Sequence, residues 1–111
     1  MWAFLMGLKT VDPLELRSII SAGDVSVFDV NSRESWSKGH VPGARNLDPQ
    51  AYRVTDLPAD KDATLVFYCS NTMCRKAPNA ARRAKEMGYR NVKVMSAGIQ
   101  GWRGKGLPTV T

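Results

Sequence analysis

Two cysteines lie five positions apart beside a pair of basic residues, in the segment Cys69-Ser-Asn-Thr-Met-Cys74-Arg75-Lys76. Cysteine reacts as the thiolate, and a free thiol with a pKa of about 8.5 is mostly protonated at neutral pH. Unpaired backbone N–H groups at a helix start, and nearby cations, favour the thiolate. Two cysteines are too few for a disulfide scaffold, and their spacing suits a local redox pair. Chemistry on a cysteine nucleophile is therefore the first function that the sequence indicates.

The elements around Cys69 are those that such chemistry needs. The run Thr64–Tyr68 predicts a buried strand that leads directly into Cys69, and an alanine-rich helix is expected over 77–87, with Gly88 as its stop. If the intervening loop turns its N–H groups inward, it forms a cradle for an anion or a charged sulfur adduct. The alternative is that Cys69 is a small buried residue at the end of a core strand, which is common for free cysteine. Both interpretations remain open on these residues alone.

Short strands and helices alternate along the rest of the chain. Strands are expected at 8–11, 25–30, 45–47 and 92–95, in addition to 64–68. A helix capped by Asp12 and stopped by Gly23, a brief helix at 32–37 and a last helix at 97–103 complete the pattern, while 48–62 is expected to be mainly loop. This alternation predicts a parallel sheet covered on both faces, with ligand sites beyond the carboxyl ends of the strands. Cys69 falls at that edge.

Composition limits the alternatives. The 111 residues allow one domain, and a hydrophobic share of 43% with 23% charged residues is ordinary for a globular chain. The formal charge of +6 favours anionic partners, such as a small oxyanion, a phosphate backbone or an acidic protein. No nucleic-acid-binding module is recognisable, so no nucleic acid is expected, and the basic residues of 75–105 are interpreted mainly as solvated faces. Two cysteines and one histidine cannot complete an ordinary zinc site, so neither metal nor cofactor is expected.

Residues 1–7 are interpreted as an N-terminal extension or an early strand preceding one domain over 8–111. The apolar stretch is too short to span a bilayer and carries no basic leader. A cytoplasmic protein is therefore expected, with an exported mature form as the alternative. The sequence is compatible with a monomer or a homodimer.

Three segments, in order over roughly 8–108, resemble rhodanese-like domains. Asp29-Val30, Trp36 and Gly39-His-Val-Pro-Gly-Ala44 resemble the first signature of that family. Val66-Phe-Tyr-Cys69, the alanine-rich helix and Gly88-Tyr89 resemble its active-site segment, and Ala97–Trp102 with Gly106-Leu-Pro108 resembles its closing signature.

The resemblance implies a small α/β domain with a central, mainly parallel sheet of about five strands and helices on both faces. It also implies a sulfurtransferase without a cofactor, in which Cys69 attacks the outer sulfur of thiosulfate or a persulfide donor. The persulfide is then taken by cyanide, a thiol or an acceptor protein. The implied substrate-binding loop consists of Ser70, Asn71, Thr72, Met73, Cys74, Arg75 and Lys76, with Arg75 and Lys76 holding the donor's oxyanion.

Three departures from the family pattern leave further hypotheses open. Five residues separate Cys69 from Arg75, where four are commonest. The longer loop resembles relatives that act on phosphate or arsenate, although those usually carry histidine where this chain has Tyr68. Asn31 stands where the family often has arginine, and Arg33 is a candidate substitute. Cys74 inside the loop is interpreted either as a resolving thiol that stores oxidised Cys69 as a disulfide or as a packing residue. A non-catalytic module that senses oxidation or binds a partner is the remaining alternative.

Four other residues of chemical interest receive structural interpretations. His40 is expected to tie down the proline turn that follows it. Trp36 and Trp102 are expected to pack in the core or against loops, and the carboxylate of Asp29 is expected to accept hydrogen bonds from nearby backbone.

Overall fold

A five-stranded sheet, all of whose strands are parallel, forms the centre of the protein in the order β1-β5-β4-β2-β3. The structure, a computed structural model, describes residues 2–111. The strands are β1 (Lys9–Thr10), β2 (Val25–Asp29), β3 (Arg45–Asn46), β4 (Thr64–Tyr68) and β5 (Asn91–Val94). β4 lies at the middle of the sheet, between β5 and β2, so the strand that leads into Cys69 is the most enclosed of the five.

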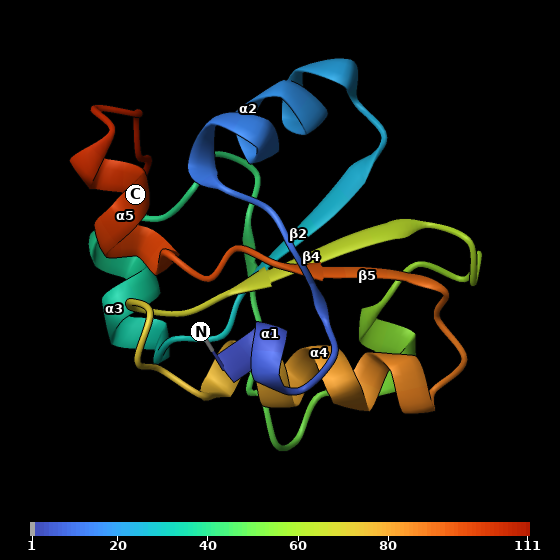
Figure 1. The fold of residues 1–111 in the computed structure, drawn as a ribbon. Coiled ribbons are helices and arrows are strands. Elements are labelled where there is room, and N and C mark those ends of the chain that lie inside the picture. Colours follow the sequence, from blue (N-terminus) through green and yellow to red (C-terminus); the bar gives the residue numbers. More distant parts are fainter. Residues whose placement is uncertain (1) are drawn as a thin grey trace.

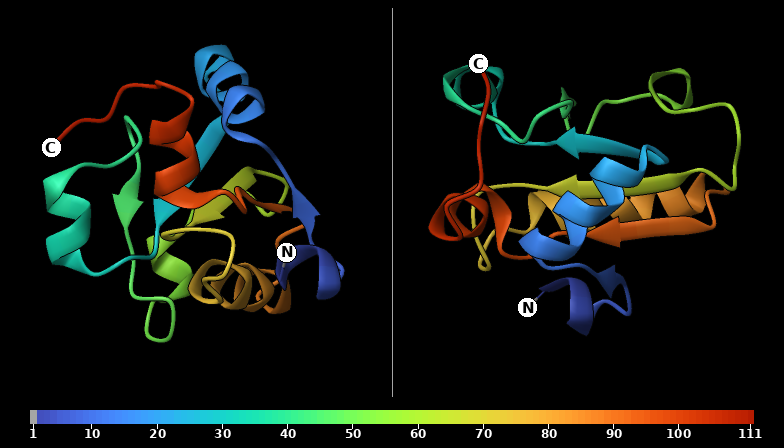
Figure 2. Two further views of the ribbon diagram at one scale, coloured as in Figure 1. Left: turned by 60° about the vertical axis from the view of Figure 1, so that its left-hand side comes forward. Right: turned by 90° about the horizontal axis from the view of Figure 1, so that it is seen from above.

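Helices cover both faces of this sheet, as Figure 1 and the two views of Figure 2 show. They are α1 (Trp2–Leu5), α2 (Pro13–Ala22), α3 (Arg33–Lys38), α4 (Lys76–Glu86) and α5 (Gly98–Gly104), with one 3₁₀ turn, η1 (Val54–Asp56). α1 and α4 lie on one face, while α2 and α5 lie on the other, with α3 beside α5. The α/β architecture expected from the alternation of strands and helices is confirmed.

Each face has its own hydrophobic core because the side chains of a strand alternate between the two faces. Leu65 and Phe67 of β4 pack towards α4, whereas Val66 and Tyr68 pack towards α2 and α5. All four are fully buried, as expected for a strand covered on both sides. The strand that precedes Cys69 is therefore held in place by packing on both faces of the sheet.

Local signals account for most element boundaries. The Asp12 side chain accepts a hydrogen bond from the Glu15 backbone N–H at 2.8 Å, and the Glu15 side chain reaches back to the Asp12 N–H. This capping box begins α2 at Pro13, and Gly23, at φ 90°, ends it in the left-handed conformation. Ser32 likewise caps α3 by accepting from the Ser35 backbone N–H.

The N-terminal residues differ from the strand considered for them. Residues 2–5 form the single helical turn α1, and Gly7, at φ 75°, turns the chain into β1. The buried side chain of Ala3 belongs to the core beneath α4, which a turn of helix over that face can reach. Met1 lies outside the described residues. Within residues 2–111, no helix is both long enough and apolar enough to cross a bilayer.

Candidate active site

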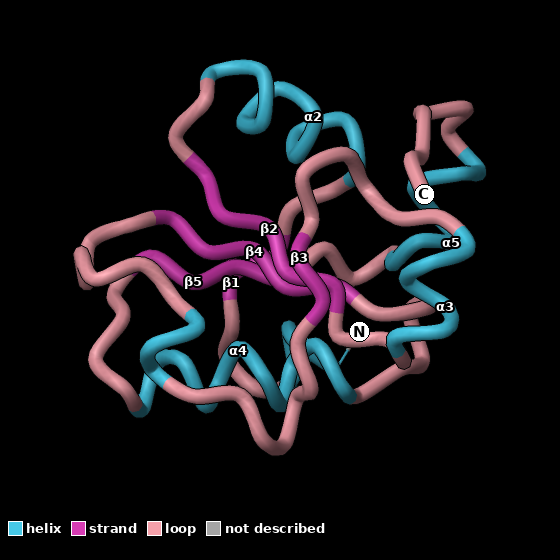
Figure 3. Tube along the Cα trace, turned by 180° about the vertical axis from the view of Figure 1, so that it is seen from behind, coloured by secondary structure: helices cyan, strands magenta, loops and turns pink. Residues whose placement is uncertain are grey.

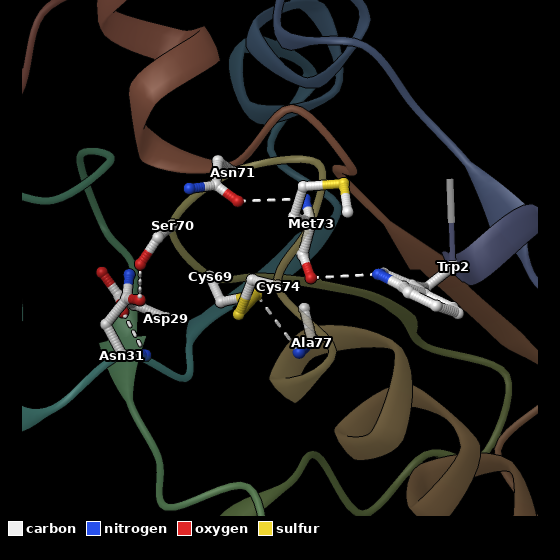
Figure 4. The surroundings of a disulfide bond; sticks show 9 residues. All are labelled: Trp2, Asp29, Asn31, Cys69, Ser70, Asn71, Met73, Cys74 and Ala77. Carbon is white, nitrogen blue, oxygen red and sulfur yellow. Dashed lines mark hydrogen bonds between the residues drawn. A yellow bond between two sulfur atoms is a disulfide. The ribbon is translucent and has the colours of Figure 1, made fainter.

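Cys69 directly follows β4, and its sulfur lies at the N-terminus of α4 (Figure 4). The backbone N–H of Ala77, in the first turn of that helix, donates to the Cys69 Sγ at 3.4 Å. Cys69 is 2% exposed. A donor at the positive end of a helix stabilises negative charge on sulfur, so this placement favours the thiolate when Cys69 is reduced.

The structure joins Cys69 to Cys74 in a disulfide, with their Cα atoms 6.4 Å apart. Local hydrogen bonds curl the loop so that the two sulfurs meet. The Asn71 carbonyl accepts from the Cys74 N–H at 3.2 Å, and the Asn71 side chain accepts from the Met73 N–H at 2.9 Å. The spacing of the cysteines therefore lets their two sulfurs meet within the loop. Met73 is directed outwards and is 67% exposed.

Most backbone N–H groups of the loop are not used within the protein. Among residues 2–111, no acceptor is present for the backbone N–H groups of Ser70, Asn71, Thr72, Arg75 and Lys76. Consecutive free N–H groups beside a helix N-terminus attract anions. The loop thus has unpaired donors beside the disulfide, and the anion cradle stays a prediction.

Backbone hydrogen bonds from the start of α5 hold the loop in place. The N–H groups of Ile99 and Gln100 donate to the carbonyls of Cys69 and Ser70 at 2.9 and 3.0 Å. Gly98, at φ 67°, approaches so closely that a Cβ there would lie 2.5 Å from the Ser70 carbonyl oxygen. Sequence reasoning did not assign this supporting role, although Gly98 stands inside the closing signature and was the available signal.

A second support comes from the loop that follows β2. The Ser70 hydroxyl donates to the Asn31 Oδ1 at 2.8 Å, and the Asn31 N–H donates to Asp29 at 2.8 Å (Figure 4). The Asn46 amide donates to the carbonyls of both Asp29 and Asn31, at 3.0 and 2.9 Å. The hydrogen bond from the Asn31 N–H confirms that the Asp29 carboxylate bonds to nearby backbone.

Asp29 and Tyr68 form a buried polar pair of residues beneath the loop. Asp29 is 1% exposed, and burial raises the pKa of its carboxyl group despite opposing hydrogen bonds, including one from the Asn31 backbone. Burial, followed by the nearby Asp29 charge, raises the pKa of the Tyr68 phenol. The Tyr68 hydroxyl accepts from the Val41 N–H at 3.0 Å, so the residue before Cys69 is tied to the turn that precedes β3.

The basic side chains near the loop have two different surroundings. The Arg75 guanidinium lies over the indole of Trp2, 3.8 Å from its centre, and the Trp2 Nε1 donates to the Met73 carbonyl at 3.0 Å. Lys76 and Arg33 instead line a hollow of about 430 Å³ next to Asn31. The substitution of Arg33 for the family's arginine stays a prediction. The contact with Trp2 was not predicted, because nothing in the sequence placed residues 1–7 over the loop.

The remaining residues of chemical interest have structural roles. His40 is 6% exposed, its Nδ1 lies 2.8 Å from the Trp36 carbonyl, and its backbone pairs with Val110. His40 thus links the start of the turn to α3 and to the C-terminal segment. Trp102 is buried and donates to the Pro108 carbonyl at 2.8 Å, as expected for a packing residue.

Comparisons with known proteins agree with this architecture. The family model for the rhodanese-like domain matches residues 12–105. Over 89 positions the chain is 40% identical to the HTH-type transcriptional regulator Rv0324 of Mycobacterium tuberculosis. The match covers 78% of this chain but only 38% of the regulator's length. The chain is 30% identical to the human thiosulfate:glutathione sulfurtransferase over 112 positions, covering 88% of this chain and 96% of the enzyme.

A solved structure of the BH2092 protein from Bacillus halodurans superposes with a TM-score of 0.82 at 23% identity, covering 96% of this chain and 80% of that one. At this identity the superposition shows a shared fold. With the family model matching most of the chain, it follows that this protein belongs to the rhodanese-like domain family.

Proposed function

We propose that this domain is a sulfurtransferase that moves sulfane sulfur from thiosulfate or a persulfide donor to a thiol or cyanide, through a persulfide on Cys69. The observation that carries the proposal is the Cys69 sulfur held by the Ala77 N–H at the start of α4. Membership of the family and similarity to a protein named as a sulfurtransferase support the class of reaction. The reaction begins from the reduced loop, in which both cysteines are thiols.

In the first half-reaction, the Cys69 thiolate attacks the outer sulfur of the donor. A new S–S bond forms at Cys69, the S–S bond of thiosulfate breaks, and sulfite leaves with the electron pair of that bond. Splitting one transfer into two through an activated nucleophile is covalent catalysis. The helix start lowers the energy of the thiolate, which raises the fraction of protein ready to attack at neutral pH.

The loop N–H groups stabilise the charge on the resulting persulfide, in the way that an oxyanion hole stabilises developing charge. In this proposal Lys76 and Arg33, which line the hollow beside Asn31, attract the sulfonate of the donor. The Arg75 guanidinium lies over the Trp2 ring and adds a further positive charge beside the loop. In this proposal the segment from Ser70 to Lys76 is the substrate-binding loop.

In the second half-reaction, an acceptor thiolate or cyanide attacks the outer sulfur of the persulfide, and the Cys69 thiolate is released. The hollow of about 430 Å³ lies beside the loop and is lined by polar side chains such as Asn31, Ser32 and Gln50.

The test is sulfite release and thiocyanate formation by freshly reduced protein supplied with thiosulfate and cyanide. Cys69→Ser is expected to lower the rate about a thousandfold or more, because serine is a far weaker nucleophile for sulfur. Ser21→Ala, on the exposed end of α2, serves as the control and is expected to keep the full rate. A Cys69→Ser variant as active as the parent protein would refute the proposal.

A further inference from the structure

We propose that Cys74 gives this site a second activity, which is the release of the transferred sulfur as hydrosulfide. In this step the Cys74 thiolate attacks the Sγ of persulfidated Cys69, forms the Cys69–Cys74 disulfide and expels the outer sulfur. The inference rests on the proposed persulfide at Cys69. It makes Cys74 a catalytic residue that competes with external acceptors.

The geometry for this attack is present in the structure, where the two sulfurs are bonded to each other. Their Cα atoms, 6.4 Å apart, lie within the range that a disulfide spans, so the loop closes without moving the strand or the helix. The atom that Cys74 reaches is the Cys69 Sγ, the inner sulfur of the persulfide. Attack there leaves the outer sulfur as the leaving group.

The step balances without an added oxidant. Protonated Cys69 persulfide and the Cys74 thiolate give the disulfide and one hydrosulfide ion; the bond between the inner and outer sulfurs breaks, and its electron pair leaves with hydrosulfide. The oxidising equivalent comes from the sulfane sulfur, which is reduced. An external dithiol then reduces the disulfide and becomes oxidised itself. Over one cycle, thiosulfate and a dithiol give sulfite, hydrosulfide and an oxidised dithiol.

The space beside the sulfurs fits the product of this step better than a new donor. A cavity of about 10 Å³ adjoins both cysteines, which is room for a group the size of one water molecule. Ser96 lines it, and its buried hydroxyl has no hydrogen-bonding partner among residues 2–111. Hydrosulfide has one heavy atom and thiosulfate has five, so this space is closer in size to the product than to the donor. Because Cys69 has no free thiolate in the disulfide form, this form cannot load another sulfur until it is reduced.

The Cys69 and Cys74 sulfurs differ in exposure, and this difference determines which of them an external dithiol attacks. Cys69 is buried and its sulfur accepts the Ala77 N–H, whereas Cys74 is only half-buried beside the exposed Met73. A dithiol consequently reaches the Cys74 sulfur first. Attack there releases Cys69 as the thiolate, which the helix start stabilises as a leaving group. Each reduction thus returns the nucleophile in its reactive form.

The experiment is a single turnover with thiosulfate alone, after the reductant has been removed from the fully reduced chain. Sulfite, hydrosulfide trapped by a bimane reagent and the intact mass are measured together. The parent protein is expected to release one equivalent of sulfite and one of hydrosulfide per chain, and to lose the mass of two hydrogens. Cys74→Ser is expected to release sulfite, keep one added sulfur and yield no hydrosulfide.

A relocated cysteine provides the matched control. The double variant Cys74→Ser, Ser21→Cys has the same number of thiols, but its second thiol lies near the start of β2, at the opposite edge of the sheet from Cys69. It is expected to keep the added sulfur as Cys74→Ser does. Hydrosulfide release at the parental level from this variant would overturn the inference, because proximity would then be irrelevant.

The failures of the two proposals are distinguishable. Sulfite release followed by a stable added sulfur on the parent protein, with Cys74 still free to alkylate, would overturn the role of Cys74 and leave the sulfurtransferase intact. Absence of sulfite from both the parent protein and Cys74→Ser would overturn the proposed function, and the inference with it.

Discussion

The loops that follow β2 and β4 begin side by side at the same edge of the sheet but differ in their hydrogen bonding. After β2, the backbone is tied down by Asn31, Asn46 and the Asp29 carboxyl. After β4, the loop from Cys69 to Arg75 contains both cysteines and keeps most of its N–H groups free among residues 2–111. Within residues 2–111, the hydrogen bond from the Ser70 hydroxyl to Asn31 is the only side-chain bond between the two loops.

The difference shows how a small domain can hold a reactive group. A loop whose donors are all used internally has none left for a substrate, whereas a loop with free donors needs its position fixed by its neighbours. Here the β2 loop and the start of α5 provide that support through Asn31, Ile99 and Gln100. Removing these supports one at a time therefore tests how the reactive loop is held.

The largest effect is expected from Gly98→Ala. Alanine at φ 67° is strained, and its Cβ would collide with the backbone of Ser70, so the loop or the start of α5 must shift. We expect the free energy of unfolding to fall by roughly 2–3 kcal/mol and sulfite release to slow markedly. Urea unfolding and single-turnover kinetics measure the two effects.

Gly104→Ala is the matched control, because the same helix carries it at a position where an added Cβ meets nothing within 4 Å. It is expected to change stability by less than about 1 kcal/mol, since alanine favours helices. If Gly98→Ala were as harmless as Gly104→Ala, the contact between α5 and the loop would not be what holds Ser70 in place.

Local patterns in the sequence predicted the strands and helices well, but they did not predict the long-range contacts that hold the loop after β4. The run from Thr64 to Cys69 and the cap at Asp12 depend on neighbours in the chain, and both are as expected. The contact of Trp2 with Arg75 joins residues far apart in the chain, so no periodicity or spacing reveals it. The backbone of α5 supports Cys69 through N–H groups, which every residue type except proline carries, so its sequence gives no direct sign of that role.

Tyr68→Phe tests the anchor beneath Cys69. The hydroxyl that accepts from the buried Val41 N–H is lost, and the N–H is left without a partner. We expect a loss of about 1–3 kcal/mol in the free energy of unfolding, measured by urea titration. Tyr89→Phe, whose hydroxyl donates to the partly buried Pro58 carbonyl, is the control and should cost less because that carbonyl can reach water. If both substitutions lowered the free energy of unfolding equally, the buried hydrogen bond to Tyr68 would contribute no more than the partly buried one from Tyr89.

The raised pKa of the Asp29 carboxyl group predicts a smaller, pH-dependent effect on the free energy of unfolding. Its pKa is raised in the folded protein above the ordinary value of 3.8, so between those two pKa values the folded state holds more protons than the unfolded state. The stabilisation from this group is full below pH 3.8 and is lost as pH rises through the raised pKa. Asp29→Asn should remove this dependence. Urea titrations of both proteins across that interval check it, and parallel stability curves would contradict it.

The smallest effect is expected from the link between the two loops. Ser70→Ala removes a partly buried hydrogen bond of 2.8 Å to Asn31, worth about 0.5–1.5 kcal/mol. Because Ile99 and Gln100 still hold the loop backbone, sulfite release should slow by no more than about tenfold. A double-mutant cycle with Asn31→Ala isolates this link from the other bonds of either residue. If the two substitutions prove additive in the sulfite-release rate, the β2 loop does not position Cys69, and the support comes from α5 alone.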